Sequence, residues 1–240
     1  MDTFLEGKIA VVTGGTRGIG LAIAAALLRS GSSVAICGRS QRSVDHALAN
    51  SLSISGSKAI GKPADVSSEE GVKHLFAAVD QAFGGLDILV NNAGVGVFAP
   101  VAQLTLEHWR TTIATNLTGV FLCSREALSR FTKRGGGAII NIGSLAGKNP
   151  FAGGAAYNAS KFGLNGFSEA MMLDHRHDNV RVSTILPGSV DTEFGGGKGA
   201  RAEWKIAPGD IAEIVLCILR MPARTMVSAV EVRPSRPRKS

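Results

Sequence analysis

A tyrosine and a lysine one helical turn apart are the residues of this sequence that most directly suggest acid–base chemistry. Tyr157 and Lys161 lie four residues apart in a segment of helical periodicity, so their side chains share one helix face. A nearby ammonium group favours the phenolate, and we therefore expect Lys161 to lower the pKa of Tyr157 from its usual value of about 10. Tyr157 is the only tyrosine in 240 residues. The pair predicts a proton-transfer site.

A serine at the end of an apolar strand extends this candidate site. Ser144 lies 13 residues before Tyr157 and follows the apolar run 138–143. Its hydroxyl could hydrogen-bond a carbonyl or carbinol oxygen. A serine nucleophile is the competing interpretation, but the Gly-x-Ser-x-Gly pattern is absent, and the five histidines lie in polar helical or loop contexts that fit no catalytic set.

Glycines directly after the first expected strand form a pattern typical of phosphate-binding turns. Their spacing is Gly-x3-Gly-x-Gly, and they open a helix rich in alanine and leucine. Glycine lets the backbone turn tightly and brings amide groups close to a pyrophosphate. The sequence therefore predicts a dinucleotide at this turn. The expected contacts are Gly14, Thr16, Arg17, Gly18, Ile19 and Gly20.

The residues after the second expected strand indicate which dinucleotide binds. A carboxylate at this place would accept hydrogen bonds from the ribose hydroxyls of NAD(H), but no acid occurs before Asp45, inside the next helix. Arg39 stands there instead, with Arg17 in the glycine turn and Arg42 as a further candidate. Their guanidinium groups suit a 2′-phosphate. We expect NADP(H).

Short β-rich runs alternate with helical segments along the whole chain, which predicts an α/β fold: a doubly wound, mostly parallel seven-stranded sheet with helices on both faces. Residues 1–240 are expected to form one domain, with a mobile flap at 195–199 and a solvated basic tail at 233–240. The expected strands are 8–13, 33–37, 58–63, 86–91, 138–143, 181–186 and 226–232. The expected helices are 18–30, 40–53, 68–83, 104–132, 155–174 and 208–220.

Composition excludes several classes of protein. Four of the 26 basic side chains lie in the last eight residues, and aromatic residues make up 5%, so we expect no nucleic-acid partner. No signal peptide or apolar run of 18 residues is present, and we expect a cytoplasmic protein without a membrane span. Cys37, Cys123 and Cys217 lack metal-ligand spacing and are expected to be buried, reduced thiols; no metal is expected.

From about Leu5 to Val232 the sequence resembles the short-chain dehydrogenase/reductase family. The resemblance is carried by the glycine turn, Ser144 and the Tyr-x3-Lys pair, together with motifs that follow other expected strands. Each motif is moderately specific, and together they occur in the family's order. The further motif residues are Asp65, Val66, Asn91, Asn92, Ala93, Gly94, Asn116, Pro187, Gly188, Val190 and Thr192.

This resemblance implies a role for each matching residue. Asp65 and Val66 would hold the adenine, 92–94 would line the adenosine-ribose side, and the stretch 187–192 would contact the nicotinamide. Tyr157 would be the general acid in reduction and Ser144 would position the substrate oxygen. Lys161 would bind the nicotinamide ribose, and Asn116 would hold a water on the proton path. The family also implies a homo-oligomer, a tetramer or dimer built on helices 104–132 and 155–174.

The leading hypothesis is an NADP(H)-dependent oxidoreductase that interconverts a small or medium, uncharged ketone and a secondary alcohol. A 3-oxoacyl-[acyl-carrier-protein] reductase is the alternative, and a non-catalytic NADP(H) sensor is the remote one. The carrier hypothesis rests on four basic residues of one helix, Arg125, Arg130, Lys133 and Arg134. The candidate pocket residues are Val95, Gly96, Leu145, Phe151, Gly154, Gly188 and Phe194.

Overall fold

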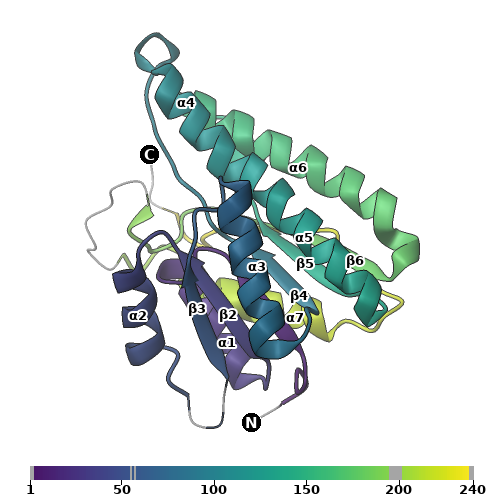
Figure 1. Ribbon diagram of the computed structural model, residues 1–240. Coiled ribbons are helices and arrows are strands. Elements are labelled where there is room, and N and C mark those ends of the chain that lie inside the picture. The colour runs from purple at the N-terminus through teal and green to yellow at the C-terminus, as the bar shows by residue number, and fades with distance from the viewer. Residues whose placement is uncertain (1–2, 55, 57, 195–201, 238–240) are drawn as a thin grey trace.

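Seven parallel strands form one sheet between two layers of helices (Figure 1). The computed structural model describes residues 3–54, 56, 58–194 and 202–237. The strand order is β3-β2-β1-β4-β5-β6-β7, and every neighbouring pair is parallel, so the expected doubly wound sheet is confirmed. The strands are β1 (Ile9–Val12), β2 (Ser33–Gly38), β3 (Ala59–Pro63), β4 (Ile88–Asn91), β5 (Gly137–Ile142), β6 (Val180–Pro187) and β7 (Ala229–Val232).

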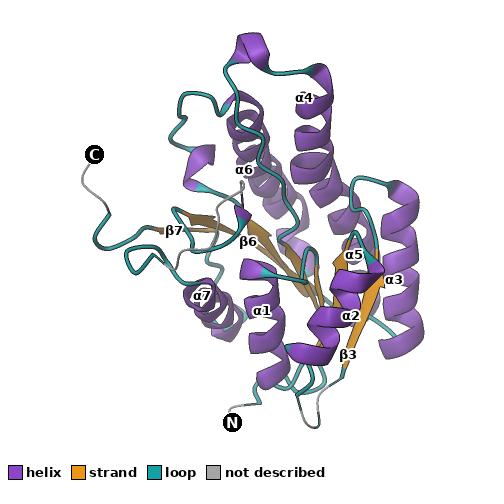
Figure 2. Cartoon of the chain, turned by 90° about the vertical axis from the view of Figure 1, so that its left-hand side faces the viewer, coloured by secondary structure: helices purple, strands orange, loops and turns teal. Residues whose placement is uncertain are grey.

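The central strands are apolar in nearly every position because both faces of the sheet are covered. In β1, Ala10 and Val12 pack into one core while Ile9 and Val11 pack into the other. The first core lies under α1, α2 and α7, and the second under α3, α5 and α6. Figure 2 shows α1 and α7 side by side on their face of the sheet.

The helices agree with the sequence prediction in order, but one expected helix is divided into two, so that seven in the described residues replace the expected six. They are α1 (Gly18–Arg29), α2 (Gln41–Asn50), α3 (Glu69–Phe83), α4 (Leu106–Ile113), α5 (Gly119–Arg134), α6 (Ala155–His175) and α7 (Pro208–Arg220). The expected single helix 104–132 consists of α4 and α5 joined by a π-helical turn, η2 (Ala114–Thr118). Short 3-10 turns are η1 (Val101–Gln103), η3 (Leu145–Gly147) and η4 (Arg176–Asp178).

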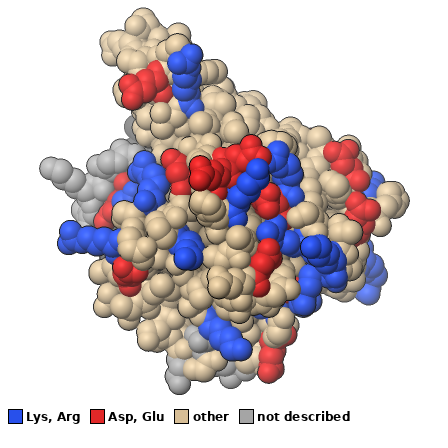
Figure 3. Space-filling model, in the orientation of Figure 1, with Lys and Arg blue, Asp and Glu red and all other residues tan. Residues whose placement is uncertain are grey.

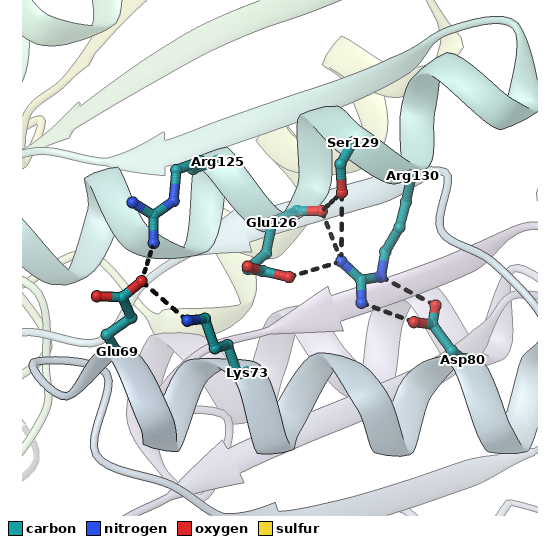
Figure 4. Close-up of polar contacts among 7 residues, drawn as sticks. All are labelled: Glu69, Lys73, Asp80, Arg125, Glu126, Ser129 and Arg130. Carbon is teal, nitrogen blue, oxygen red and sulfur yellow. Dashed lines mark hydrogen bonds and ion pairs between the residues drawn. The ribbon is translucent and has the colours of Figure 1, made fainter.

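Ion pairs join the outer faces of α3 and α5 (Figure 4). Arg130 donates two hydrogen bonds to Asp80, at 2.9 and 2.6 Å, and Arg125 donates one to Glu69 at 2.7 Å. Arg130 also pairs with Glu126 on its own helix at 2.9 Å. Acidic and basic side chains accordingly lie close together on this face in Figure 3. The arginines predicted to meet an acidic carrier are therefore paired within the chain.

Two further expectations need correction. Cys37 and Cys123 are buried, but Cys217 is exposed on α7 because it faces away from the sheet. The last strand begins at Ala229 instead of 226, where its pairing with β6 starts. In the described part of the tail, Arg233 and residues 235–237 are exposed, while Pro234 packs against Gly188.

Some expectations fall on other parts of the chain. The predicted flap at 195–199 and the end of the tail, 238–240, lie outside the described residues. In the described part, no helix is long and apolar enough to cross a membrane. Within the same residues, no group of three or more His, Cys, Asp or Glu side chains could hold a metal ion.

A buried carboxylate, which the sequence analysis missed, links structural elements at the amino end of the sheet. Asp87 precedes β4 and accepts a hydrogen bond from the Ile9 amide at 3.0 Å. Its oxygens also pair with Lys8 at 3.3 Å and with Arg134 at 2.9 Å. Asp87 thereby joins β1, β4 and the end of α5.

Asp87→Asn should lower the free energy of unfolding by about 1.5–3 kcal/mol, because it removes the charge that two cations share while it keeps the side-chain shape. Urea denaturation at neutral pH measures this change. Glu107→Gln, which neutralises an exposed carboxylate on α4, is the matched control and should change stability by less than about 0.5 kcal/mol. Equal stability of the two variants would contradict the structural role of Asp87.

Candidate active site

The predicted site residues gather at the carboxyl edge of the sheet. The chain runs outward from β1 to β3 and then returns to β4 on the other side of β1, so the strand order reverses between β1 and β4. Ligands of open α/β sheets bind in the crevice at this reversal. The glycine turn follows β1, the stretch 92–94 follows β4, Ser144 follows β5 and the stretch 188–192 follows β6.

The glycine turn is fixed to the end of β4. The Thr13 hydroxyl accepts hydrogen bonds from the amides of Asn92 and Ala93, each at 3.0 Å. The Asn92 side chain donates in return to the carbonyls of Thr13 at 2.9 Å and Gly14 at 3.1 Å. A Cβ on Gly14 would lie 2.9 Å from the Ala93 Cα, so only glycine fits. Asn92 thus stabilises the turn itself.

The start of α1 can accept a dinucleotide phosphate. Gly14 and Gly18 have φ angles of 63° and 54°, a region that favours glycine. Within the described residues no side chain caps α1, so the amides of its first turn are not taken by a side-chain acceptor. A Cβ on Gly18 would lie 3.2 Å from Thr192 Cγ2, which places the stretch after β6 beside the turn. These features fit a bound pyrophosphate.

The end of β2 lies next to the glycine turn. A Cβ on Gly38 would lie 2.6 Å from Thr16 Cγ2, and the exposed Arg39 follows immediately. Arg17, from the turn, is also exposed, and its Nη1 pairs with Glu193 Oε2 at 2.9 Å. The two arginines expected to meet a 2′-phosphate therefore flank one edge of the turn. The Glu193 carboxylate would therefore compete with a bound 2′-phosphate for the Arg17 guanidinium.

The residues expected to hold the adenine lie after β3. The Asp65 carboxylate accepts hydrogen bonds from the Ser67 amide at 2.9 Å and the Ser67 hydroxyl at 2.7 Å, which shapes this turn. Val66 is buried, and a Cβ on Gly119 of α5 would lie 2.9 Å from its Cγ2. Both residues are thus placed at the same edge as the glycine turn.

Tyr157 and Lys161 lie in the first two turns of α6, as their spacing predicts. The Lys161 ammonium donates to the Ile142 carbonyl at the end of β5, at 2.9 Å, and lies 5.7 Å from the centre of the Tyr157 ring. The Ser144 hydroxyl lies close enough to the Tyr157 phenol to lower its pKa, and it accepts from the Ala146 amide at 3.1 Å. The structure therefore brings Ser144, Tyr157 and Lys161 together.

The electrostatics of this group differ from the sequence expectation. Burial raises the pKa of Tyr157, and the nearby Ser144 hydroxyl offsets this rise only in part. Burial also lowers the pKa of Lys161 to about 8, because removing an ammonium from water disfavours its charge. The expected lowering of the Tyr157 pKa is therefore wrong for this arrangement. Desolvation is the largest cause of both shifts.

Asn116 is placed by the π-helical turn η2 and is almost fully buried. Its Oδ1 accepts from the Val95 amide at 2.8 Å, while its Nδ2 donates to the Val95 carbonyl at 2.9 Å and to the Ser160 hydroxyl at 3.0 Å. Ser160 donates to the Tyr157 carbonyl at 2.7 Å. Asn116 thus joins the loop after β4 to the first turns of α6. The water expected on it stays a prediction.

Two amides of α6 hold the loop that carries Ser144, and the sequence analysis missed both. Asn158 donates to the Ala146 carbonyl at 2.7 Å, and Asn165 donates to the Gly147 carbonyl at 3.0 Å. The positions 158, 161 and 165 follow helical spacing, so the two amides share a face with Lys161. This spacing was the available signal.

The stretch after β6 completes the site. Pro187 ends β6, and Val190 forms an isolated bridge with Ile206. Gly188 lies against the start of the tail, where a Cβ on it would be 3.2 Å from Pro234 Cδ and 3.1 Å from Leu145 Cδ1. Leu145 and Gly188, both expected to line the pocket, are therefore neighbours.

Two phenylalanines contact Tyr157, and a third contacts one of them. The ring centres of Phe98 and Phe194 lie 5.6 and 5.7 Å from that of Tyr157, and Phe151 lies 5.7 Å from Phe98. Phe151 and Phe194 are among the predicted pocket residues. Phe98 is not, because it lies in a loop whose path the local sequence does not determine.

Comparisons with known proteins agree with this geometry. A family model described as short chain dehydrogenase matches residues 8–202. An uncharacterized oxidoreductase of Staphylococcus aureus (strain USA300) is 33% identical over 232 residues, which are 97% of this chain and 99% of that protein. An uncharacterized oxidoreductase of Methylorubrum extorquens is 39% identical over 189 residues, 79% of this chain and 75% of that protein.

Two solved structures share the fold over nearly the whole chain. An alcohol dehydrogenase from the archaeon Thermococcus sibiricus, complexed with 5-hydroxy-NADP, has a TM-score of 0.90 and 31% identity, and covers 97% of this chain and 99% of that one. A metagenomic short-chain oxidoreductase in complex with NADP has a TM-score of 0.84 and 37% identity, with the same coverage. By its sequence and its structure, this chain belongs to the short-chain dehydrogenase family of oxidoreductases.

Proposed function

We propose that the protein is an NADP(H)-dependent oxidoreductase that interconverts an uncharged ketone and a secondary alcohol. The observation that carries the proposal is the placement of Tyr157 beside Ser144 and Lys161, at the sheet edge that also bears the glycine turn. A phenol and a hydroxyl that converge on one point can bind a carbonyl oxygen and protonate it.

The residues of the crevice fit the nucleotide. NADPH, when bound, supplies the hydride for reduction of the carbonyl carbon. The amides of the glycine turn and of the start of α1 would hold the pyrophosphate, and Arg39 with Arg17 would hold the 2′-phosphate. Asp65 and Val66 would face the adenine, and Val190 and Thr192 the carboxamide. The solved relatives that hold NADP or its 5-hydroxy analogue support this choice.

Each residue of the catalytic group has one task. Ser144 donates a hydrogen bond to the substrate oxygen and orients it, and it keeps its own proton. Tyr157 transfers its proton to the oxygen as negative charge develops there, and its raised pKa keeps that proton in place at neutral pH. Lys161 would bind the nicotinamide ribose and, when protonated, stabilise the phenolate that remains. Asn116 holds α6 against the loop after β4.

The alternatives have weaker support. In the carrier hypothesis, Arg125, Arg130 and Arg134 would meet acidic groups of a carrier, but each is paired with a carboxylate of this chain. A non-catalytic sensor does not need the complete set of Asn116, Ser144, Tyr157 and Lys161.

We also propose that residues 1–240 act as a single domain and that the protein is a cytoplasmic homo-oligomer. Large apolar side chains on the outer faces of the helices α4, α5 and α6 support a subunit contact there. These exposed residues are Leu106, Trp109, Phe121, Phe162 and Leu173.

Tyr157→Phe should fold, bind NADPH normally and reduce ketones at least ~100-fold more slowly, because it keeps the ring but removes the transferable proton. Turnover followed by NADPH absorbance, together with NADPH titration, measures both properties. Adding Phe131→Tyr to the Tyr157→Phe variant places a phenol on α5 instead of α6, and this second change should not restore activity. Near-normal turnover of Tyr157→Phe would show that Tyr157 is only a packing residue.

Lys161 should make stability depend on pH. Its pKa is about 8 in the folded chain and 10.5 when unperturbed, so the unfolded chain binds more protons between these values and stability rises with pH. Relative to Lys161→Met, the unmodified chain should gain up to about 2 kcal/mol between pH 8 and 9.5. Urea denaturation without added nucleotide measures this difference, and a difference that stays constant with pH would refute it.

Arg39→Asp should weaken NADPH binding about 10- to 100-fold and leave NADH binding unchanged or stronger, because a charge-assisted contact with the 2′-phosphate contributes about 1.5–3 kcal/mol. Titration calorimetry with both nucleotides measures this. Arg29→Asp makes the same charge change at the far end of α1 and should affect both nucleotides equally. Equal affinity of the unmodified chain for NADPH and NADH would overturn the proposed specificity.

A further inference from the structure

Three aromatic side chains around Tyr157 are exposed to an extent that packing does not explain. Phe98, Phe151 and Phe194 expose 46%, 46% and 43% of their surface. Single exposed apolar residues are common, but several that adjoin one another mark a binding surface. Here Phe98 and Phe194 contact Tyr157, which we propose as the proton donor, and Phe151 contacts Phe98. The free energy of covering their rings is therefore available to a substrate.

The rings have the geometry of aromatic recognition. Phe98 meets Tyr157 edge-on, with an interplanar angle of 76°, and Phe194 is tilted against it by 51°. Phe98 also contacts a second ring, that of Phe151, at an interplanar angle of 55°. Centre-to-centre distances of 5.6 to 5.7 Å lie within the range of attractive ring contacts. A further ring could join this cluster in the same geometry.

Gly96 lets both rings reach this position. A Cβ on Gly96 would lie 2.8 Å from Phe98 Cζ and 2.8 Å from Phe194 Cε1, so any side chain there would displace the rings. The loop that carries Phe98 is held in turn by a hydrogen bond from the Ala99 amide to the Gly153 carbonyl, at 2.8 Å. Phe98 and Phe194 come from loops after different strands and converge over one backbone segment.

We propose that Phe98 and Phe194 recognise an aryl ring attached to the carbonyl carbon, so that the substrates are aryl ketones and aryl secondary alcohols; this rests on the proposed function. A substrate oxygen hydrogen-bonded to the Tyr157 phenol places the groups on its carbon beside the Tyr157 ring. The two phenylalanines contact that same ring. The ring–ring contacts add affinity for an aryl group beyond the area that it buries.

The test compares two alcohols that differ only in aromaticity, 1-phenylethanol and 1-cyclohexylethanol. The cyclohexyl compound is more hydrophobic, so burial alone favours it. Titration calorimetry in the presence of NADPH measures binding without reaction, since alcohol and nucleotide are both reduced. We expect 1-phenylethanol to bind about 3- to 10-fold more tightly.

Variants assign this preference to the two rings. Phe98→Leu and Phe194→Leu keep an apolar side chain and should each reduce the preference severalfold, while Gly96→Ala keeps both rings but moves them and should do the same. Phe4→Leu removes a ring that packs on the core under α1 and α7 and should leave the preference unchanged. Thermal melting checks that each variant is folded. If the two leucine variants do not fold, the aryl preference of Gly96→Ala decides whether the rings cause it.

Equal binding of the two alcohols, tighter binding of the cyclohexyl compound or no binding of either would overturn the inference. So would a preference that survives in all folded variants of Phe98, Phe194 and Gly96. Reduction of acetophenone and of cyclohexyl methyl ketone by NADPH is measured in parallel. If both ketones are reduced without an aryl preference in binding, only this inference fails, whereas the reduction of neither contradicts the proposed function itself.

Discussion

The candidate site depends on the side chain of Asn116, which joins segments far apart in the sequence. It pairs with both backbone groups of Val95 and with the Ser160 hydroxyl, so it fixes the loop after β4 against the start of α6. A π-helical turn adds a residue to one turn of the helix, and such turns are frequent at functional sites. Without Asn116, the amide and the carbonyl of Val95 would lose these hydrogen-bond partners, and the loop after β4 would lose this link to the first turns of α6.

Burial then determines the electrostatics of the group that Asn116 positions. A phenol and an ammonium that share a helix face would favour each other's charged forms in water, but here both lose solvent. The pKa of Tyr157 rises and that of Lys161 falls to about 8, so both shifts favour the neutral forms. A protonated phenol is the form that a general acid for carbonyl reduction requires. The same burial favours a neutral Tyr157 and a neutral Lys161 before the charged nucleotide binds.

Much of the fold and part of the site could be predicted from the sequence because the signals are local. Apolar runs ending in glycine or serine mark strand ends, and parallel strands bring those ends to one edge, which places the glycine turn and Ser144 together. The remainder depends on contacts between distant residues. The carboxylate of Asp87, the path of the loop that carries Phe98 and the sign of the Tyr157 pKa shift all follow from tertiary packing, for which no spacing along the chain gives a signal.

We propose that a ketone or alcohol oxygen binds between Ser144 and Tyr157. A crystal structure of the protein with NADPH and a secondary alcohol would show where this oxygen lies. We expect the alcohol oxygen within about 2.6–3.2 Å of both the Tyr157 and Ser144 hydroxyl oxygens, on the sheet edge that holds the nucleotide. An alcohol bound away from Tyr157, with the nucleotide in the crevice, would contradict it.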